Sequence, residues 1–240
     1  MSDARTGTLY LVATPIGNLG DLSARAVETL KSADIVACED TRHSRALFTH
    51  YGVTPRRIES YHAHNADHKT GALVRELSAG VSVALVTDAG TPGISDPGVK
   101  LVAAAVAAGV TVCPIPGPCA PVLALTASGF PSHRFVFEGF LPRKKGRRTM
   151  FESWRGEKRT IVFFEAGNRL VRTLENIREA LGPEVRVCVA REMTKLHEEF
   201  LRGTVEAVLA QLAARKEVKG EVTIVLAANR PSGMEDDGVG

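Results

Sequence analysis

The sequence is poor in the features that mark extracellular, membrane and fibrous proteins. Its four cysteines are widely spaced and form no C-x-x-C pair, which argues against a disulfide framework or a zinc ribbon and favours a reducing compartment. The longest apolar stretch, 101–110, is far shorter than the roughly 20 residues that span a bilayer, and the polar first residues do not resemble a signal peptide. No repeat or low-complexity segment is present. We therefore expect a cytoplasmic protein without membrane association.

The residues that are present indicate a globular protein with an uneven charge distribution. Of the 240 residues, 44% are hydrophobic and 24% are charged, which are ordinary values for a folded chain. The net charge is only +3, but the segment 134–159 holds nine basic and three acidic residues and carries +6, which leaves −3 for the rest. A basic segment on a nearly neutral protein predicts a polyanionic partner that binds at one place.

Apolar runs of strand length alternate with helical patterns along most of the chain, which indicates an α/β fold. Four runs are rich in β-branched residues and apolar on both faces, as is typical of buried parallel strands: 9–14, 35–39, 81–87 and 110–115. Further strands are predicted at 135–139, 160–166, 185–191 and 222–228. Helices are predicted at 22–33, 42–50, 66–79, 97–108, 120–128, 169–181 and 204–216.

Proline and glycine cluster at 116–132, which indicates a boundary between two consecutive α/β domains. We expect an N-terminal domain at 1–117, a C-terminal domain at 118–230 and a frayed tail at 231–240. A cleft between the two domains is the expected ligand site.

The first glycine-containing loop, 14–23, only partly matches a dinucleotide-binding pattern. It follows a strand and opens a helix, and Glu39 ends the next strand about 20 residues later, as that pattern requires. However, only G-x-x-G is present, and Asp21 at the helix start would repel a pyrophosphate. A tight turn is the simpler interpretation.

The loop 87–98, TDAGTPGISDPG, is a more specific signal. It holds three glycines and two prolines, so it can bring bare backbone amides against a ligand. Asp88 stands at the carboxyl end of a strand, where open α/β sheets bind ligands, whereas Asp96 is better interpreted as the N-cap of the next helix. The loop 114–121 packs four prolines around Gly117 and is either a rigid hinge or a second wall of the same site.

Together the motifs resemble those of the tetrapyrrole methylase superfamily. The resemblance runs from about residue 8 to 228 and is carried, in order, by TPIGNLGDLS, CEDTR, TDAGTPGISDPG, PIPGPCA, GFLPRK and REMTKLHEEFLRG. It implies two α/β domains, a homodimer, and S-adenosyl-L-methionine bound in the cleft between the domains. Within the superfamily, the motifs are similar to those of enzymes that methylate a cytidine 2′-hydroxyl in small-subunit ribosomal RNA, near the decoding centre.

The resemblance also implies a set of cofactor-binding residues in three parts of the chain. In the 87–98 loop they are Asp88, Gly90, Pro92, Gly93, Ile94 and Ser95. In the next loop they are Pro116, Gly117, Cys119 and Ala120, and in the C-terminal domain Phe164, Glu165, Met193 and Gly220.

The sequence departs from the family pattern in a few places. Thr87, Cys38 and Cys119 stand where Ser, Ala and Ser are more frequent, and Gly167-Asn168 replaces a usual Pro-His. We also expect the helical C-terminal extension of many relatives to be missing.

CEDTR and the histidine-rich segment 61–68 are the expected substrate side of the site. Methyl transfer to a hydroxyl needs a proton acceptor, and Asp40 is the candidate, although a helix N-cap explains it equally well. Arg42, His62, His64 and Asn65 are expected to touch RNA. The H-x-H-x3-H spacing is weak evidence for a metal, because no cysteine or well-placed carboxylate completes a site, and we expect none.

The run 141–148, LPRKKGRR, is the centre of the basic segment. Pro142 and Gly146 indicate a loop near the mouth of the cleft. We expect phosphate contacts from Arg143, Lys144, Lys145, Arg147 and Arg148, although such runs are often merely solvated surface.

Three other functions remain as alternatives. A tetrapyrrole C-methyltransferase or a protein methylase would have the same fold, but would not need the basic run. A non-catalytic RNA-binding assembly protein would keep the fold and lose methyl transfer. A nicotinamide-dependent dehydrogenase would require phosphate at the 14–23 loop, which Asp21 opposes.

Overall fold

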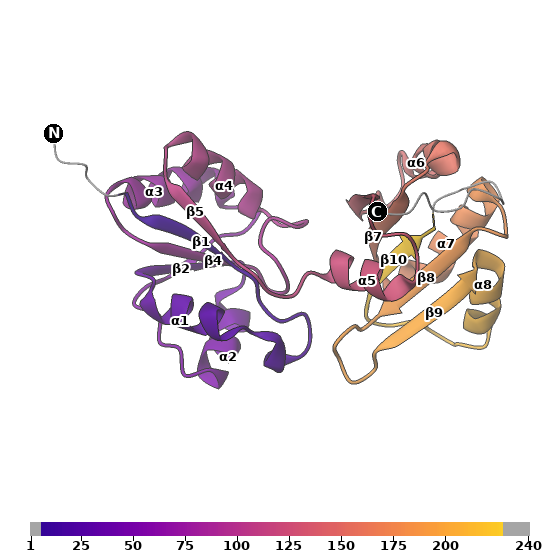
Figure 1. Cartoon of the computed structure of the whole chain (residues 1–240), viewed down its shortest axis with the longest axis horizontal. Coiled ribbons are helices and arrows are strands. Elements are labelled where there is room, and N and C mark those ends of the chain that lie inside the picture. Colours follow the sequence, from indigo (N-terminus) through magenta and orange to yellow (C-terminus); the bar gives the residue numbers. More distant parts are fainter. Residues whose placement is uncertain (1–5, 228–240) are drawn as a thin grey trace, which may run out of the picture. The chain divides into compact units, whose positions relative to one another are not determined.

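The computed structural model describes residues 6–227 and forms two compact units (Figure 1). The chain divides between Cys119 and Ala120, two residues beyond the end of the predicted N-terminal domain. The predicted tail at 231–240, and residues 228–230 of the predicted C-terminal domain, lie outside the described residues. No helix among residues 6–227 is long and apolar enough to cross a membrane.

Unit 1 is a five-stranded parallel sheet between two pairs of helices. Its strands, in the spatial order β3-β2-β4-β1-β5, are β1 (Thr8–Val12), β2 (Ile35–Cys38), β3 (Ile58–Ser60), β4 (Val83–Val86) and β5 (Thr111–Ile115). Its helices are η1 (Leu19–Asp21), α1 (Ala24–Ser32), α2 (Thr41–His50), α3 (Ala66–Ser78) and α4 (Gly98–Ala107). The parallel arrangement predicted from the two-sided apolar runs is confirmed.

The helices of unit 1 lie two on each face of the sheet (Figure 1). One core joins α1 and α2 to the sheet and contains Leu30 and Phe48. The other joins α3 and α4 and contains Leu77 and Leu101. Because β2 and β4 are buried along their whole length, both faces of the sheet centre are dry, as a parallel sheet requires.

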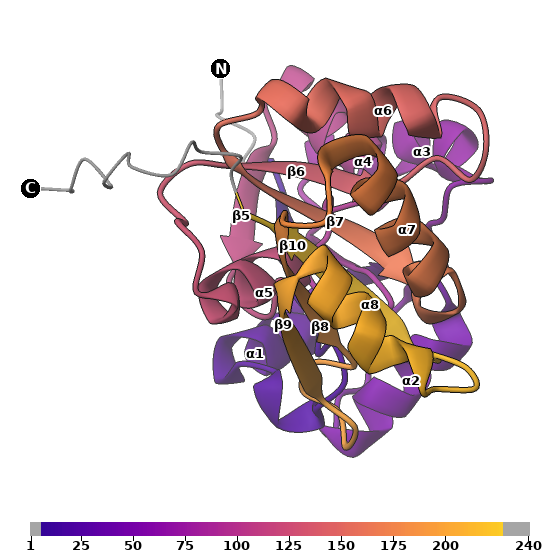
Figure 2. The same ribbon diagram turned by 90° about the vertical axis from the view of Figure 1, so that its right-hand side faces the viewer.

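Unit 2 is a mixed sheet with helices α6, α7 and α8 packed on one face (Figure 2). Its strands, in the order β6-β7-β10-β8-β9, are β6 (Phe135–Phe140), β7 (Thr160–Ala166), β8 (Arg186–Arg191), β9 (Glu199–Thr204) and β10 (Glu221–Leu226). Its helices are α5 (Ala120–Ser128), α6 (Arg147–Ser153), η2 (Trp154–Gly156), η3 (Gly167–Arg169), α7 (Leu170–Leu181) and α8 (Val205–Ala213). β6 and β7 are parallel, whereas β10 is antiparallel to both of its neighbours, β7 and β8.

The structure corrects the sequence prediction at two places in unit 2. The loop predicted within 141–148 ends at Gly146, and Arg147 and Arg148 begin helix α6, because Phe151 and Trp154 are buried in the core of the unit. The helix predicted at 204–216 ends at Ala213, and the segment before it, which received no assignment, is the edge strand β9.

Candidate functional site

The carboxyl edge of the unit 1 sheet is where the chain reverses its direction of winding. From β1 the chain passes through α1 to β2 on one side of the sheet, and from β4 it passes through α4 to β5 on the other side. β1 and β4 are neighbours, so the loops that follow them diverge to opposite faces. Open α/β sheets bind their ligands at such a point. The two loops that leave this point are 14–23, which the sequence predicts as a tight turn, and 87–98, which it predicts as a ligand-binding loop.

Backbone hydrogen bonds fix these two loops to each other. Thr14 and Gly90 exchange N–H···O bonds of 2.9 and 3.1 Å, and the Thr14 hydroxyl donates to the carbonyl of Thr87 at 3.1 Å. Gly90 has φ +84°, which a residue with a side chain adopts only with strain. The 87–98 loop is therefore anchored to the strand beside it before any ligand binds.

The loop after β5 joins the same edge. The Thr91 hydroxyl donates to the carbonyl of Pro118 at 2.8 Å. A Cβ at Gly117 would lie 2.9 Å from the Cβ of Ala13, so only glycine allows this close approach between the loops. The two predicted walls, 87–98 and 114–121, are thus neighbours within unit 1.

Carboxylates converge at this edge. The Asp88 side chain accepts a 3.0 Å hydrogen bond from the backbone N–H of Asp40, and the Glu39 carboxylate accepts one of 3.3 Å from the Thr87 hydroxyl. The pKa of Glu39 is raised, first by burial and then by the negative charges of Asp88 and Asp96. A site whose carboxylates repel one another favours a cationic ligand and disfavours a phosphate.

The structure gives Asp40 the cap position that was considered for it, whereas Asp96 lies one residue before Pro97, which is the N-cap of α4. One oxygen of Asp96 accepts from the N–H groups of Gly93 and Gly98, at 3.1 and 2.7 Å, and Gly98 begins α4. Asp40 is the N-cap of α2, accepts from the backbone N–H of Arg42 at 2.8 Å, and pairs with the Arg42 side chain at 2.8 Å. These hydrogen bonds hold the pKa of Asp40 well below its usual range. A proton-accepting role for Asp40 stays a prediction.

The segment 61–68 is held in place by Asn65 rather than by its histidines. The Asn65 side chain accepts from the backbone N–H of His62 at 2.8 Å and donates to the carbonyl of Ser60 at 3.1 Å. His64 is exposed, and its ring centre lies 6.0 Å from that of His62. Among residues 6–227, no group of three His, Cys, Asp or Glu side chains could hold a metal ion.

In unit 2, the predicted cofactor-binding residues gather at one end of the sheet but face different sides. β10 starts where β7 and β8 end, with Glu221 opposite Ala166 and Val222 opposite Arg191, so Gly220 lies at the end of β7 and Met193 follows the end of β8. Phe164 and Glu165 are consecutive on β7, and consecutive strand residues point to opposite faces. Phe164 contacts the rings of Phe137 and Phe140.

Glu165 is a buried ion-pair centre that connects β7, α6 and α7. Its side chain has no exposed surface and pairs with Arg147 at 3.1 Å and Arg169 at 2.5 Å. It also accepts hydrogen bonds from the Thr173 hydroxyl at 2.8 Å and the N–H of Ala166 at 2.9 Å. Burial raises the pKa of Glu165, but these partners outweigh it and the net pKa is lowered. The predicted contact with a cofactor stays a prediction, and no surface of the side chain is open to one in this conformation.

The five cations of the basic run fall into different environments. Arg143, Lys144 and Lys145 are exposed in the loop before α6. Arg148 is exposed and pairs with Glu152 one turn along α6, at 2.8 Å. Arg147, in contrast, is only 11% exposed and is committed to Glu165. The sequence did not reveal this difference, because the partner of Arg147 is 18 residues away on a strand.

Comparison with known proteins gives the chain's relatives. A family model for tetrapyrrole (corrin/porphyrin) methylases matches residues 8–209. A protein of Synechocystis named ribosomal RNA small subunit methyltransferase I is 49% identical over 96% of this chain and 84% of its own length. One of the same name from Mesorhizobium japonicum is 52% identical over 90% of this chain and 74% of its own length.

Solved structures share the fold at much lower identity. A diphthine synthase is 16% identical with a TM-score of 0.69 over 92% of this chain and 90% of its own. The uroporphyrin-III C-methyltransferase of Thermus thermophilus, in complex with S-adenosylhomocysteine, is 22% identical with a TM-score of 0.61 over 92% of this chain and 97% of its own. These structures show that the chain shares their fold.

Proposed function

The chain belongs to the tetrapyrrole methylase family, and on this basis we propose that it methylates 16S ribosomal RNA with S-adenosylmethionine as the methyl donor. The proposed target is the 2′-hydroxyl of a cytidine near the decoding centre. Support for an RNA substrate comes from relatives at 49% and 52% identity that carry the name of a small-subunit ribosomal RNA methyltransferase. We expect the enzyme to act in the cytoplasm. We also expect a homodimer, and light scattering of the purified protein tests this oligomeric state.

The carboxylate edge of unit 1 is the observation that carries the cofactor assignment. Glu39, Asp88 and Asp96 lie at the point where an α/β sheet binds ligands, and the pKa of Glu39 is raised first by burial and then by repulsion from the other two carboxylates. A cation placed there relieves this repulsion. S-adenosylmethionine carries a sulfonium and an ammonium, so its charge fits the residues present, whereas the pyrophosphate of a dinucleotide does not.

The proposed contribution of the chain to catalysis is mainly alignment. When bound, S-adenosylmethionine supplies a methyl group on a sulfonium, which needs no further activation. The 87–98 loop is fixed by Thr14 and Pro118 and therefore offers preformed backbone groups for binding. Alignment of two reactants is worth several kcal/mol or more of the activation barrier, about 7 to 11 in the best cases. In unit 2, Phe164, Met193 and Gly220 stay predicted cofactor contacts.

The activity is tested by methyl transfer to ribosomal RNA. We expect the purified protein to transfer labelled methyl groups from S-adenosylmethionine to unmethylated small subunits. Mass mapping of the RNA gives the nucleotide, and resistance of the adjacent phosphodiester to alkali distinguishes 2′-O-methylation from base methylation. Labelled base, or a methylated tetrapyrrole with unlabelled RNA, would contradict the proposal.

Cofactor binding at the unit 1 edge is tested by Asp88→Asn, which removes the charge and keeps an acceptor for the Asp40 N–H. A hydrogen bond to a charged group contributes about 1.5 to 3 kcal/mol, so we expect the affinity for S-adenosylmethionine to fall about 10- to 100-fold by calorimetric titration. The matched control is Asp67→Asn, which removes an exposed carboxylate on α3. Equal affinities in the two variants would place the cofactor elsewhere.

A further inference from the structure

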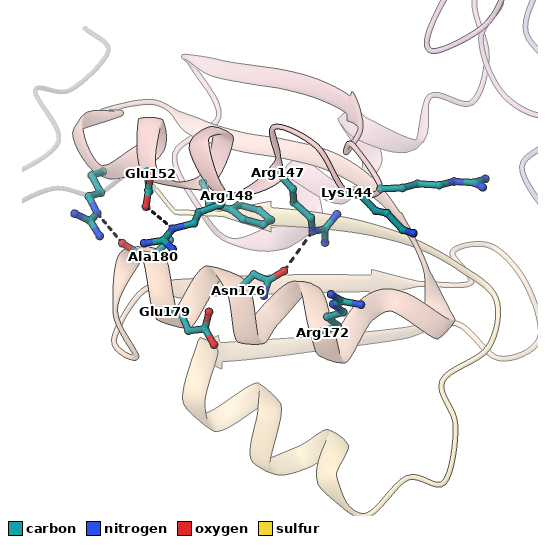
Figure 3. A pocket seen from close by; sticks show the side chains of 11 residues that line it. Lys144, Arg147, Arg148, Glu152, Arg172, Asn176, Glu179 and Ala180 are labelled. Atoms are coloured by element: carbon teal, nitrogen blue, oxygen red, sulfur yellow. Dashed lines mark hydrogen bonds and ion pairs between the residues drawn. The ribbon is translucent and has the colours of Figure 1, made fainter.

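A groove between α6 and α7 lies wholly within unit 2 (Figure 3). It has a volume of about 520 Å³, within the range of about 300 to 1,000 Å³ that holds a small-molecule-sized group. One wall of the groove comes from α6 and the loop before it, and the other comes from α7. The two walls are distant in sequence. The lining residues are Arg143, Lys144, Arg147, Arg148, Phe151, Glu152, Arg155, Arg172, Asn176, Glu179 and Ala180.

The charge in the groove is strongly positive and concentrated at one end. Six of the eleven lining residues are Arg or Lys, and only Glu152 and Glu179 are acidic. Figure 3 shows Lys144 and Arg172 at one end, with Glu152 and Glu179 at the other and Arg147 and Asn176 between them. The two acidic side chains therefore do not neutralise the Lys144 and Arg172 end.

Three of the six cations have no partner within the described part of the chain. Arg148 pairs with Glu152, Arg147 pairs with Glu165, and Arg155 donates to the carbonyl of Ala180. No hydrogen bond or ion pair with residues 6–227 engages the charged side-chain groups of Arg143, Lys144 or Arg172. Unpaired cations held around one hollow are the arrangement expected for an anionic ligand that is not part of the chain.

Arg172 is placed against the preference of its own helix. It is the third residue of α7, whose first turn has no acidic residue, and a cation near a helix N-terminus is electrostatically unfavourable. An anion bound in the groove reverses this effect. The sequence did not predict that Arg172 lies beside the basic run 141–148, since Arg172 is 24 residues beyond the end of that run.

We propose that the α6–α7 groove binds the sugar-phosphate backbone of the RNA substrate, with Arg143, Lys144 and Arg172 as the phosphate contacts. This inference rests on the proposed function for the class of partner. Apart from Phe151, which is buried, and Ala180, every lining residue has a charged or polar side chain, so the groove suits a phosphodiester chain better than an apolar ligand. Arg147 is a positioning residue, because Glu165 and Thr173 hold its guanidinium in the floor. Contacts of this kind orient an RNA without reading its sequence.

The test compares removal of charge inside and outside the groove. Arg172→Gln and Lys144→Gln each remove one unpaired cation, and Lys158→Gln removes an exposed one of the same basic segment that does not line the groove. The probe is a labelled single-stranded RNA of mixed sequence, with affinity measured by fluorescence anisotropy over a series of salt concentrations. S-adenosylmethionine affinity and circular dichroism are measured in parallel as controls for folding.

Each groove contact should contribute about 0.7 to the slope of log affinity against log salt. We therefore expect Arg172→Gln and Lys144→Gln each to lower the slope by about 0.7 and RNA affinity about fivefold at 0.1 M salt. The double variant should lose about 25-fold, Arg172→Lys should keep the wild-type slope, and Lys158→Gln should change neither quantity. Cofactor affinity should stay unchanged in all of them.

Two results would overturn the inference. One is an unchanged salt slope in Arg172→Gln and Lys144→Gln, and the other is an equal loss in Lys158→Gln, which would indicate a diffuse charge effect. The binding assay needs no turnover, so its outcome is separate from the proposed activity. A protein that binds RNA through the groove and transfers no methyl group contradicts the proposed function alone, whereas methylation that survives both groove substitutions contradicts the groove alone.

Discussion

Asp40 lies beside the carboxylate edge of unit 1, and its structural role competes with the catalytic role predicted for it. Its carboxylate caps α2 and pairs with Arg42, and its pKa is held below the usual range, which makes it a weak base. We therefore expect Asp40→Asn to keep turnover within a few-fold of the wild type, because Asn also caps helices well. Single-turnover methyl transfer at saturating cofactor measures this.

A loss of turnover would instead support the proton-accepting role that the sequence predicts for Asp40. General base catalysis contributes about 10²- to 10⁴-fold, so a fall of 100-fold or more in Asp40→Asn, with cofactor affinity intact, identifies it as the acceptor. Asp40→Ala removes the helix cap as well as the charge, so its comparison with Asp40→Asn isolates the effect of the cap, which acts on stability and not on proton transfer. Urea unfolding measures the capping role of Asp40 in stability, and the methyl-transfer rate measures its role as a base.

Glu165 is the residue whose replacement should destabilise unit 2 most specifically. Glu165→Gln leaves Arg147 and Arg169 without their buried counter-charge, and removal of one partner from a buried ion pair costs about 3 to 5 kcal/mol. We expect urea unfolding to show a loss of that size. Glu152→Gln is the matched control, since its exposed pair with Arg148 contributes little to stability. Similar losses in the two variants would mean that Glu165 is not the centre of a buried network.

At the scale of elements, Glu199 connects the edge strand β9 to neighbouring parts of unit 2 through ion pairs. This carboxylate pairs with Arg191 across the strand pair at 3.1 Å, and with Arg215 after α8. The Arg215 hydrogen bond is the main cause that lowers the pKa of Glu199 to about 2, from 4.5. Because the pKa is lower in the folded state, the unfolded chain binds more protons between these values, and Glu199 stabilises the fold above pH 4.5.

The lowered pKa of Glu199 in the folded state predicts how its contribution to stability depends on pH. The difference in unfolding free energy between wild type and Glu199→Gln should be constant above about pH 4.5 and shrink as the pH falls toward about 2. Urea unfolding over a pH series measures it, with Glu217→Gln, an exposed carboxylate paired with Lys219, as the control. A difference that stays constant across this range would show that the ion pairs do not determine the stability of β9.

Local patterns predicted some elements and not others, for physical reasons. Strands β2 and β4 are apolar at every position and were predicted from that alone. β9 was not, because an edge strand needs only one apolar face: only Leu201 of its six residues is buried, and its pairing is supplied by β8. Helix α6 was hidden by its cations, although Met150, Phe151 and Trp154 follow a helical spacing.

The candidate site shows the same division. The 87–98 loop was predicted, since its glycines and prolines and its position after a strand are local signals. The exchange of hydrogen bonds between Thr14 and Gly90, the pair Arg147–Glu165 and the groove position of Arg172 depend on segments distant in sequence. A single sequence carries no direct signal for such contacts.

At the scale of the whole molecule, the two units hold separate cores. Two hydrophobic clusters lie within unit 1, one on each face of its sheet, and one larger cluster lies within unit 2. The proposed cofactor edge and the proposed RNA groove therefore rest on different cores. Substitutions that alter RNA binding at the groove, such as Arg172→Gln, should be separable from those that alter cofactor binding, such as Asp88→Asn.

The position of β10 has a consequence for the order in which the units form during synthesis. Unit 1 has all of its strands once Ile115 has left the ribosome, so its sheet can close while the rest of the chain is being made. In unit 2, the central place between β7 and β8 belongs to 221–226, the last strand in sequence among the described residues. Until those residues emerge, β7 and β8 each have an unpaired edge. The nascent chain then consists of a folded unit 1 and a unit 2 whose sheet is incomplete.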